Sequence, residues 1–334
     1  MTKKTLNRRS PKRHSPKKPY RTRNWREYNA ALVGRGSLTV WLDEAALKGW
    51  LNQERSGKRG ASLTYSDAAV TAALLLKVVY RLPLRATQGL LGCVLEMMGL
   101  ALPVPHYSTL CRRQASLKVV IPYQVRQEPL HLVVDSTGCK VYGEGEWKVR
   151  LHGTNKRRTW RKLHLGVDEQ SGEVVAVTLS TNSVSDGEVL PKLLEQVEVP
   201  LSQVSGDGSY DQRRCYETLQ ERQRAQEQEW QQPLKVAIPP RRGAHIWQHG
   251  NSGQQGLARD ENLRRIRQVG RKRWKQESGY HRRSIAETVM SRYKRLLGEK
   301  LRARDYSRQA REAFIGCMAL NRMVALGMPQ SYAT

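Results

Sequence analysis

The spacing of apolar residues in the first third of the chain is helical. Between about residues 37 and 115, apolar side chains recur at three- and four-residue intervals, most clearly over 68–80 and 86–98. This is the period of helices that each bury one face. Prolines and Gly99 interrupt the pattern and mark the expected turns. The pattern therefore predicts a compact helical region.

The last helix expected in this region is short and carries two arginines. It runs from Ser108 to Leu117, follows a Pro-rich turn, and contains Arg112 and Arg113. In a helix-turn-helix, a short helix after a tight turn reads the major groove of DNA. We therefore expect Arg112 and Arg113 to contact DNA, although any compact helical bundle would give a similar pattern.

Near residue 130 the pattern changes from helices to strands. The apolar run 130–134 is typical of a buried strand, and 162–167 and 174–179 alternate on either side of a turn. The segments that follow are expected to form a helix, a strand and a second helix, over residues 190–197, 199–204 and 213–229. Together these elements predict an α/β domain with a mixed sheet covered by helices.

The charge of the chain points to a polyanionic partner. It contains 58 Lys and Arg against 30 Asp and Glu, a formal net charge of +28, which exceeds what solubility requires. Binding of phosphates by Lys and Arg releases counterions, and this makes nucleic acid the expected partner. A basic protein that binds RNA, or one that is merely basic, remains an alternative on composition alone.

Residues 1–26 are the most basic part of the chain. They contain eleven Lys or Arg and no acid, and such composition favours a disordered arm that can lie along DNA. A solvated tail without specific contacts is the alternative. Residues 231–275 are rich in Pro, Gly, Gln and Arg and predict an irregular insertion.

The cysteines and the hydropathy bear on the compartment of the protein. The five cysteines are scattered and show no spacing typical of a zinc site. No apolar stretch reaches the roughly 20 residues that a membrane-spanning helix needs. We therefore expect a soluble cytoplasmic protein with reduced thiols.

Two aspartates follow expected strands. Asp135 comes after the apolar run that ends at Val134. Asp207 comes after the strand expected over residues 199–204 and lies between Gly206 and Gly208. Each alone is more often a turn former. Two aspartates at the ends of strands in one sheet can converge, however, and form an acidic site.

A third carboxylate, Glu287, lies on a helix expected to begin near Ser284. Ile285, Val289 and Tyr293 line one face of this helix, whereas Glu287 and Lys294 lie on another. Ser284 and Glu287 also have the spacing of a capping box, in which the glutamate only satisfies the helix N-terminus. The local sequence leaves both roles open.

Tyr280, Arg283, Glu287 and Lys294 match, at every spacing, the Y-x2-R-x3-E-x6-K signature of DDE transposases from bacterial insertion sequences. The segments around Asp135 and Asp207 also resemble the first and second acidic motifs of that family. From about residue 30 to 326 the chain is similar to the insertion sequence 5 group. The resemblance implies an RNase H-like catalytic domain in which Asp135, Asp207 and Glu287 are the catalytic triad and the metal ligands.

The resemblance also implies a cofactor. Mg²⁺ prefers oxygen ligands and is bound through carboxylates and substrate phosphates. Two ions about 4 Å apart can activate the attacking oxygen and stabilise the leaving oxygen of a phosphodiester. We expect two Mg²⁺ ions, with Mn²⁺ as a substitute, and Tyr280, Arg283 and Lys294 are expected to contact DNA around them.

The resulting hypothesis is a transposase that binds the terminal inverted repeats of an insertion sequence and cleaves and joins DNA strands. It comprises the basic arm 1–26, a helical DNA-binding region 27–125 and a catalytic domain 126–328. Its expected partners are the transposon ends, target DNA and a second copy of the chain, in the cytoplasm of a bacterium and at its nucleoid. The alternatives are a nuclease that does not join strands and a catalytically silent DNA-binding protein derived from a transposase.

Overall fold

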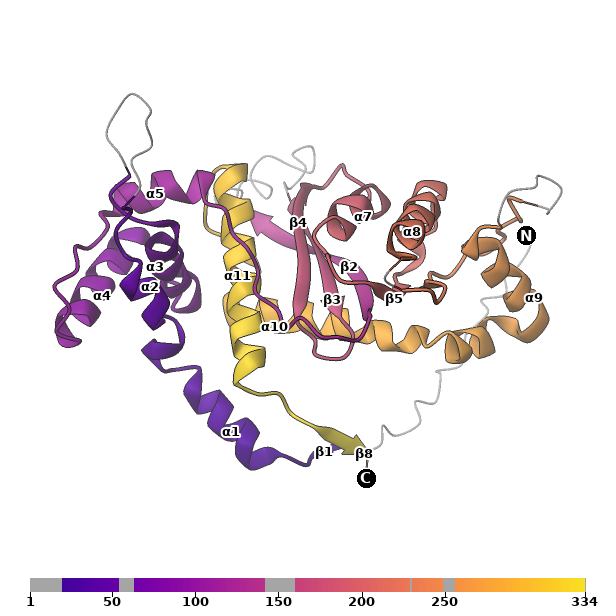
Figure 1. Cartoon of the computed structure of the whole chain (residues 1–334), viewed down its shortest axis with the longest axis horizontal. Helices are drawn as coiled ribbons and strands as arrows, with labels where there is room; N and C mark the ends of the chain where they lie inside the picture. The colour runs from indigo at the N-terminus through magenta and orange to yellow at the C-terminus, as the bar shows by residue number, and fades with distance from the viewer. Residues whose placement is uncertain (1–19, 54–62, 142–159, 229, 249–255, 334) are drawn as a thin grey trace, which may run out of the picture.

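The computed structural model describes residues 20–53, 63–141, 160–228, 230–248 and 256–333 (Figure 1). A group of helices lies at one end, a mixed sheet occupies the centre, and α9 lies at the other end. None of the helices in these ranges is long and apolar enough to cross a membrane. The five cysteines, all within these ranges, form no disulfide.

Within the described residues, four helices form the bundle that the apolar spacing predicts between about residues 37 and 115. They are α2 (Glu44–Lys48), α3 (Asp67–Val79), α4 (Leu84–Met97) and α5 (Tyr107–Ser116). Helix α1 (Trp25–Gly34) precedes this range and packs against α11 (Tyr306–Leu326). The side chain of Ser66 caps α3 by accepting a hydrogen bond from the Ala69 amide at 3.1 Å. Eight of the thirteen residues of α3 are buried, because α3 packs against α4 and α5 and also against α11.

The sheet is mixed, as predicted, and is built around one long strand. This strand, β2 (Leu130–Val141), is antiparallel to β3 (Trp160–Asp168) and parallel to β5 (Leu201–Ser205). The order across the sheet is β4-β3-β2-β5-β6, and β7 also pairs with β2. The remaining strands of this sheet are β4 (Val174–Thr181), β6 (Lys235–Ala237) and β7 (Lys300–Leu301).

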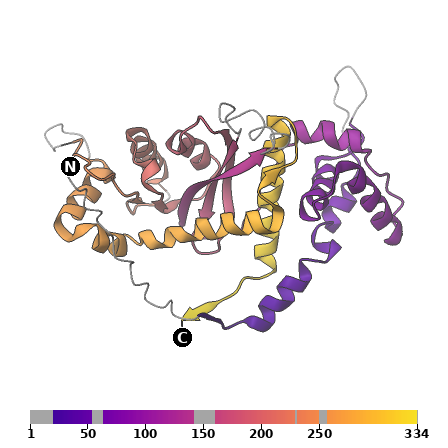
Figure 2. The same cartoon turned by 180° about the vertical axis from the view of Figure 1, so that it is seen from behind.

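Successive residues of β2 face two separate hydrophobic cores. Val133 belongs to the core that includes α3, α10 (Ser284–Leu297) and α11, whereas Leu132 and Val134 belong to the other core. The second core contains α7 (Asp186–Leu194) and α8 (Arg213–Gln226). Both faces of the sheet are therefore covered, which explains why Leu132, Val133 and Val134 are all apolar instead of alternating with polar residues. Figure 2 shows α10 crossing the strands on the face away from α7 and α8.

Two expected boundaries are wrong. Residues 20–26 of the expected arm are ordered: Tyr20–Thr22 form β1, which pairs with β8 (Ser331–Ala333), and α1 begins at Trp25. Residues 1–19 lie outside the described residues. Asp135 is not at the end of a strand, because β2 continues past it to Val141 in register with β3.

The expected irregular insertion at 231–275 contains β6 and most of α9 (Ala258–Glu277). Gly270 adopts φ 80° and kinks the helix, a backbone conformation that favours glycine. Composition missed α9 because few of its residues are apolar; the four that are buried are Arg259, Asp260, Leu263 and Trp274.

A buried ion cluster attaches α9 to the loop after β5. The guanidinium of Arg259 donates to Asp211 at 2.8 Å and lies 3.3 Å from Asp260, and all three side chains are almost fully buried. It also stacks over the ring of Trp247, 3.6 Å from the centroid. Asp211 in turn accepts hydrogen bonds from the Arg241 amide and the Tyr216 hydroxyl. This cluster fixes the chain four residues beyond Asp207.

We expect the Arg259→Gln variant to lose about 3–5 kcal/mol of unfolding free energy, because two buried carboxylates lose their cation. Urea denaturation measures this change. The matched control is Arg264→Gln on the same helix, whose ion pair with Glu261 is exposed and worth at most about 1 kcal/mol. Equal losses in the two variants would contradict a special role for Arg259.

His164 is expected to make stability depend on pH. It is fully buried in β3, its Nε2 bonds to Ser180 at 2.7 Å, and its Nδ1 has no hydrogen-bond partner. Burial lowers the pKa of His164 to about 4, against the opposing charge of Asp186. Because the folded pKa lies below the unfolded value, the unfolded chain binds more protons, and stability is lost as the pH falls from about 6.5 toward 4.

Denaturation at pH 7 and pH 5 should show that His164→Gln loses about 2 kcal/mol less between these pH values than the parent protein does. The same substitution at the exposed His281 should leave the pH dependence unchanged. A parent protein and a His164→Gln variant with the same pH dependence would show that His164 is not held neutral by the fold.

Candidate active site

The register of the central strands brings Asp135 and Asp207 together. Val133 of β2 pairs with Ser205 of its parallel neighbour β5. Asp135, within β2, and Asp207, just beyond the end of β5, each lie two residues further along and are therefore at the same level. Asp135 is half-buried, and its Oδ1 accepts a hydrogen bond from the Ser136 amide at 2.8 Å.

The loop that carries Asp207 is tightly held. Asp207 Oδ1 accepts a hydrogen bond from the Ser209 amide at 2.9 Å and another from the Ser209 hydroxyl. A Cβ at Gly206 would lie 2.9 Å from the ring of Tyr210 and 3.1 Å from Val134, so that only glycine fits between them. The glycine before Asp207 is therefore required by close packing.

Glu287 is linked to Asp135 through the side chain of Arg283. Arg283 ends the 3₁₀ turn η3 (Tyr280–Arg283), and α10, which packs against β2 and β3, begins at the next residue. Nη1 of Arg283 donates a hydrogen bond to Asp135 Oδ2 at 2.7 Å, and Nη2 of Arg283 donates one to Glu287 Oε1. One guanidinium thus joins a carboxylate of the sheet to a carboxylate of the helix.

The capping-box alternative for Glu287 does not hold in this structure. Arg283, not Ser284, occupies the N-cap position of α10, and no side chain caps the helix. Glu287 pairs with the Arg283 side chain instead. The i, i+4 spacing of Arg283 and Glu287 was the sequence signal for this pair, which the sequence analysis did not use.

The charges of Asp207 and Glu287 both act on Asp135. Burial raises the pKa of Asp135, and the negative charges of Asp207 and Glu287 raise it further, against the Ser136 amide and the Arg283 guanidinium. Burial opposes the charge on Arg283, yet the nearby carboxylates outweigh it and raise the Arg283 pKa. Arg283 is therefore the counter-ion of an acidic cluster.

The other two signature residues lie on either side of this cluster. The ring of Tyr280 packs 6.0 Å from Trp274 and lies under the guanidinium of Arg283, 5.8 Å from its centroid. Lys294 lies toward the other end of β2, where its charge acts on the thiol of Cys139. Tyr280 thus borders the cluster, whereas Lys294 stands apart from it.

The two arginines of α5 have different environments. Arg113 is buried, donates to the Tyr65 carbonyl at 2.7 Å, and forms an ion pair with Asp67 at 2.5 Å. It therefore joins α5 to the start of α3, and this structural role replaces the DNA contact expected for it. Arg112 is exposed and stays a predicted DNA contact.

The chemical nature of the three carboxylates fits a hard divalent cation. Asp135, Asp207 and Glu287 offer only carboxylate oxygens, the ligands that Mg²⁺ prefers. In the present arrangement no group of three His, Cys, Asp or Glu side chains within the described ranges is placed to hold a metal ion. Arg283 occupies the position between Asp135 and Glu287 that a shared cation would need. Metal binding therefore requires Arg283 to release at least one carboxylate.

The chain matches two models of protein families. Residues 33–144 match one model described as transposase DDE domain, and residues 126–322 match a second model with the same description. The first match includes the helical bundle and Asp135, and the second includes all three carboxylates. Among solved structures, a piggyBac transposase synaptic complex with hairpin DNA is similar with a TM-score of 0.42 and 11% identity, over 87% of this chain and 75% of that chain.

The second model alone spans more than half of the sequence and covers the sheet, α10 and the acidic cluster. Its span runs from just before β2 into α11. This chain therefore belongs to the transposase DDE domain family.

Proposed function

We propose that the protein is the transposase of an insertion sequence, which binds the terminal inverted repeats of its element and catalyses strand cleavage and strand transfer. The observation that carries the proposal is the acidic cluster: Asp135, Asp207 and Glu287 come from two adjacent strands and a helix and share one electrostatic environment. The mixed sheet supports an RNase H-like domain. The signature from Tyr280 to Lys294 supports placement in the insertion sequence 5 group.

We propose that the three carboxylates hold two Mg²⁺ ions, for which Mn²⁺ can substitute. When bound, such ions would activate an attacking oxygen and stabilise a leaving oxygen. The protein itself contributes the positions of the three carboxylates. Asp135 and Asp207 are fixed by the strands and by hydrogen bonds to backbone amides, whereas the exposed Glu287 side chain can change its rotamer.

Arg283 has two successive roles in this proposal. Without metal, its guanidinium neutralises Asp135 and Glu287. Once a cation takes over that neutralisation, the guanidinium becomes available for a DNA phosphate, which its planar set of donors fits. Tyr280 supports it from the side, and Lys294 and Arg112 contribute further contacts to the DNA backbone.

The reaction has two displacements at phosphorus. In cleavage, the oxygen of water bonds to a phosphorus and the bond from that phosphorus to the 3′ oxygen breaks, leaving a 3′-hydroxyl. In joining, this hydroxyl bonds to a phosphorus of the target DNA and displaces the 3′ oxygen there. Two ends must react together, so we propose that a homodimer or higher oligomer assembles on DNA in the bacterial cytoplasm, at the nucleoid.

Glu287→Gln is expected to reduce cleavage of a labelled duplex carrying the element's own termini by at least about a hundredfold, because a ligand charge contributes several kcal/mol. Binding of the same duplex should persist. Glu217→Gln, at an exposed position of α8, is the matched control and should cut normally. A Glu287→Gln variant that cuts as well as the parent protein would remove Glu287 from the active site.

Manganese binding tests the cofactor apart from activity. In the absence of DNA, Arg283→Met should bind Mn²⁺ roughly tenfold more tightly than the parent protein, because the competing guanidinium and its charged hydrogen bonds are gone. Asp135→Asn should bind it more weakly. Electron paramagnetic resonance of free Mn²⁺ measures both.

A parent protein and an Arg283→Met variant that both fail to bind Mn²⁺ would contradict the metal site. That result, together with retained DNA binding, would instead indicate the alternative function, a catalytically silent DNA-binding protein.

A further inference from the structure

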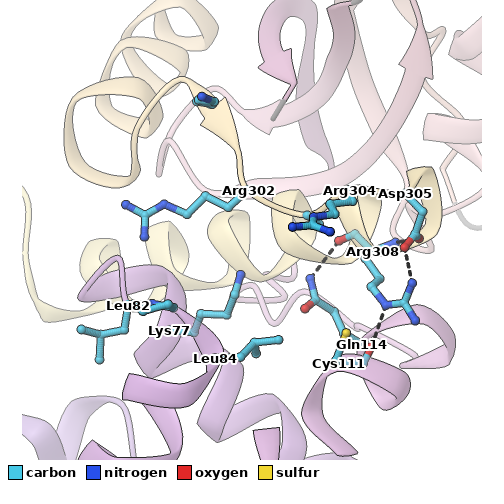
Figure 3. A pocket seen from close by; sticks show the side chains of 12 residues that line it. Lys77, Leu82, Leu84, Cys111, Gln114, Arg302, Arg304, Asp305 and Arg308 are labelled. Carbon is cyan, nitrogen blue, oxygen red and sulfur yellow. Dashed lines mark hydrogen bonds and ion pairs between the residues drawn. The ribbon is translucent and has the colours of Figure 1, made fainter. Parts of the chain in front are cut away.

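A basic cavity lies between the helical bundle and the end of the sheet. Its volume is about 850 Å³, within the rough range of 300–1,000 Å³ for ligand sites. One wall comes from α3, the start of α4 and α5, and the other comes from the segment between β7 and the first turn of α11 (Figure 3). The acidic cluster is not part of it.

Positive charge predominates in the lining of this cavity. Five of the lining side chains are cationic and one is acidic: Lys77, Lys300, Arg302, Arg304 and Arg308, with Asp305. Asp305 forms an ion pair with Arg308, and Lys77 lies 3.7 Å from Glu312 behind the wall. The cationic side chains of the lining thus outnumber these two acids.

The form of the cavity favours phosphate over other anions. Arg302 and Arg304 are exposed, and arginine presents a planar set of donors that matches phosphate oxygens. Leu82, Leu84 and Ala303 supply apolar surface beside these charges. Apolar walls lower the local dielectric and strengthen the attraction for an anion that enters.

The cavity lies along the same strand as the acidic cluster. Lys300 of β7 pairs with Lys140 of β2, five residues beyond Asp135. At about 3.3 Å per residue, this separation is roughly 17 Å, or about five nucleotides of a duplex strand at 3.4 Å each. Lys140, which forms an ion pair with Glu299, and Lys294, whose charge acts on the thiol of Cys139, lie near this path.

We propose that this basic cavity binds phosphate groups of the DNA strand whose scissile bond lies at the acidic cluster, about five nucleotides away. The proposal rests on the proposed function, because it assigns the same DNA a second point of contact. It also gives the helical bundle a part in holding the reacting strand, since half of the cavity wall belongs to that bundle.

Cys111 reports occupancy of the cavity directly. It lines the cavity, is partly exposed, and carries a free thiol, whereas the exposed Cys93 on α4 lies outside the lining. The other three cysteines are buried. Alkylation by iodoacetamide can be followed at each cysteine by peptide mass spectrometry, and the rate at Cys93 is the internal reference for the rate at Cys111.

With a 40-base-pair duplex carrying the element's termini, in EDTA so that no strand is cut, we expect alkylation of Cys111 to slow about tenfold as access is lost. The rate at Cys93 should not change. Saturating DNA that leaves the rate at Cys111 unchanged would overturn the proposal, while DNA binding itself would still support the proposed function. A parent protein that binds no DNA would overturn both.

The charge of the cavity is tested by salt titration of DNA binding. Arg302→Gln with Arg304→Gln should reduce the slope of log K against log salt by about 1.8, at 0.9 for each lost phosphate contact. Lys192→Gln with Arg224→Gln removes the same charge from the exposed surface of α7 and α8 and should leave the slope unchanged. Equal effects of the two pairs would show that the cavity arginines act only through the net charge of the protein, and this would overturn the proposal.

Inorganic phosphate and dAMP distinguish a free ligand from a DNA strand. At millimolar concentration neither should protect Cys111 as well as the duplex does, because a duplex that other basic side chains of the protein also hold reaches the cavity at high effective concentration. Protection by dAMP without protection by the duplex would show a mononucleotide site and overturn the proposal.

Discussion

The central strand β2 is the element on which the rest of the structure depends. It pairs with β3 on one side and with β5 and β7 on the other, and its side chains enter both hydrophobic cores. A shift of β2 by one residue would exchange its two faces and place apolar residues of one core in the other. The same register sets Asp135 beside Asp207, so that packing of the cores and geometry of the acids are specified together.

One guanidinium holds the acidic cluster together. Three carboxylates that interact through a half-buried region repel one another. Arg283 offsets this repulsion from inside the site, and it can do so because it lies at the start of α10, between the sheet and Glu287.

Much of the fold follows from the sequence because apolar spacing is a local signal. The helices over 67–79 and 84–97, the strands around the turn at 168–172, and the mixed sheet were predicted in this way. The extent of β2 was not, because polar residues from Asp135 to Thr137 resemble a turn when the pairing partner β3 is unknown. Helix α9 was missed because it is held by Arg259 and Asp260 rather than by an apolar face.

In the candidate site, too, local spacing singles out residues, whereas their contacts depend on how the elements pack. The spacing from Tyr280 to Lys294 identified the residues, but only the structure shows that Arg283 contacts the two acids while Lys294 lies near Cys139. Arg113 was expected at DNA because of its charge. Its burial against Asp67 depends on how α5 and α3 pack, which no local pattern contains.

Helix α11 has a consequence for the order in which the chain can mature. Its residues complete the core shared by α3, α5 and the sheet, yet α11 begins more than two hundred residues after α3 in the sequence. During translation the N-terminal helices leave the ribosome first, but they cannot bury all of their apolar surface until α11 has been made. A chain that lacks α11 therefore exposes apolar surface of the helical bundle, and the synthesis of this helix determines when the hydrophobic core can be completed.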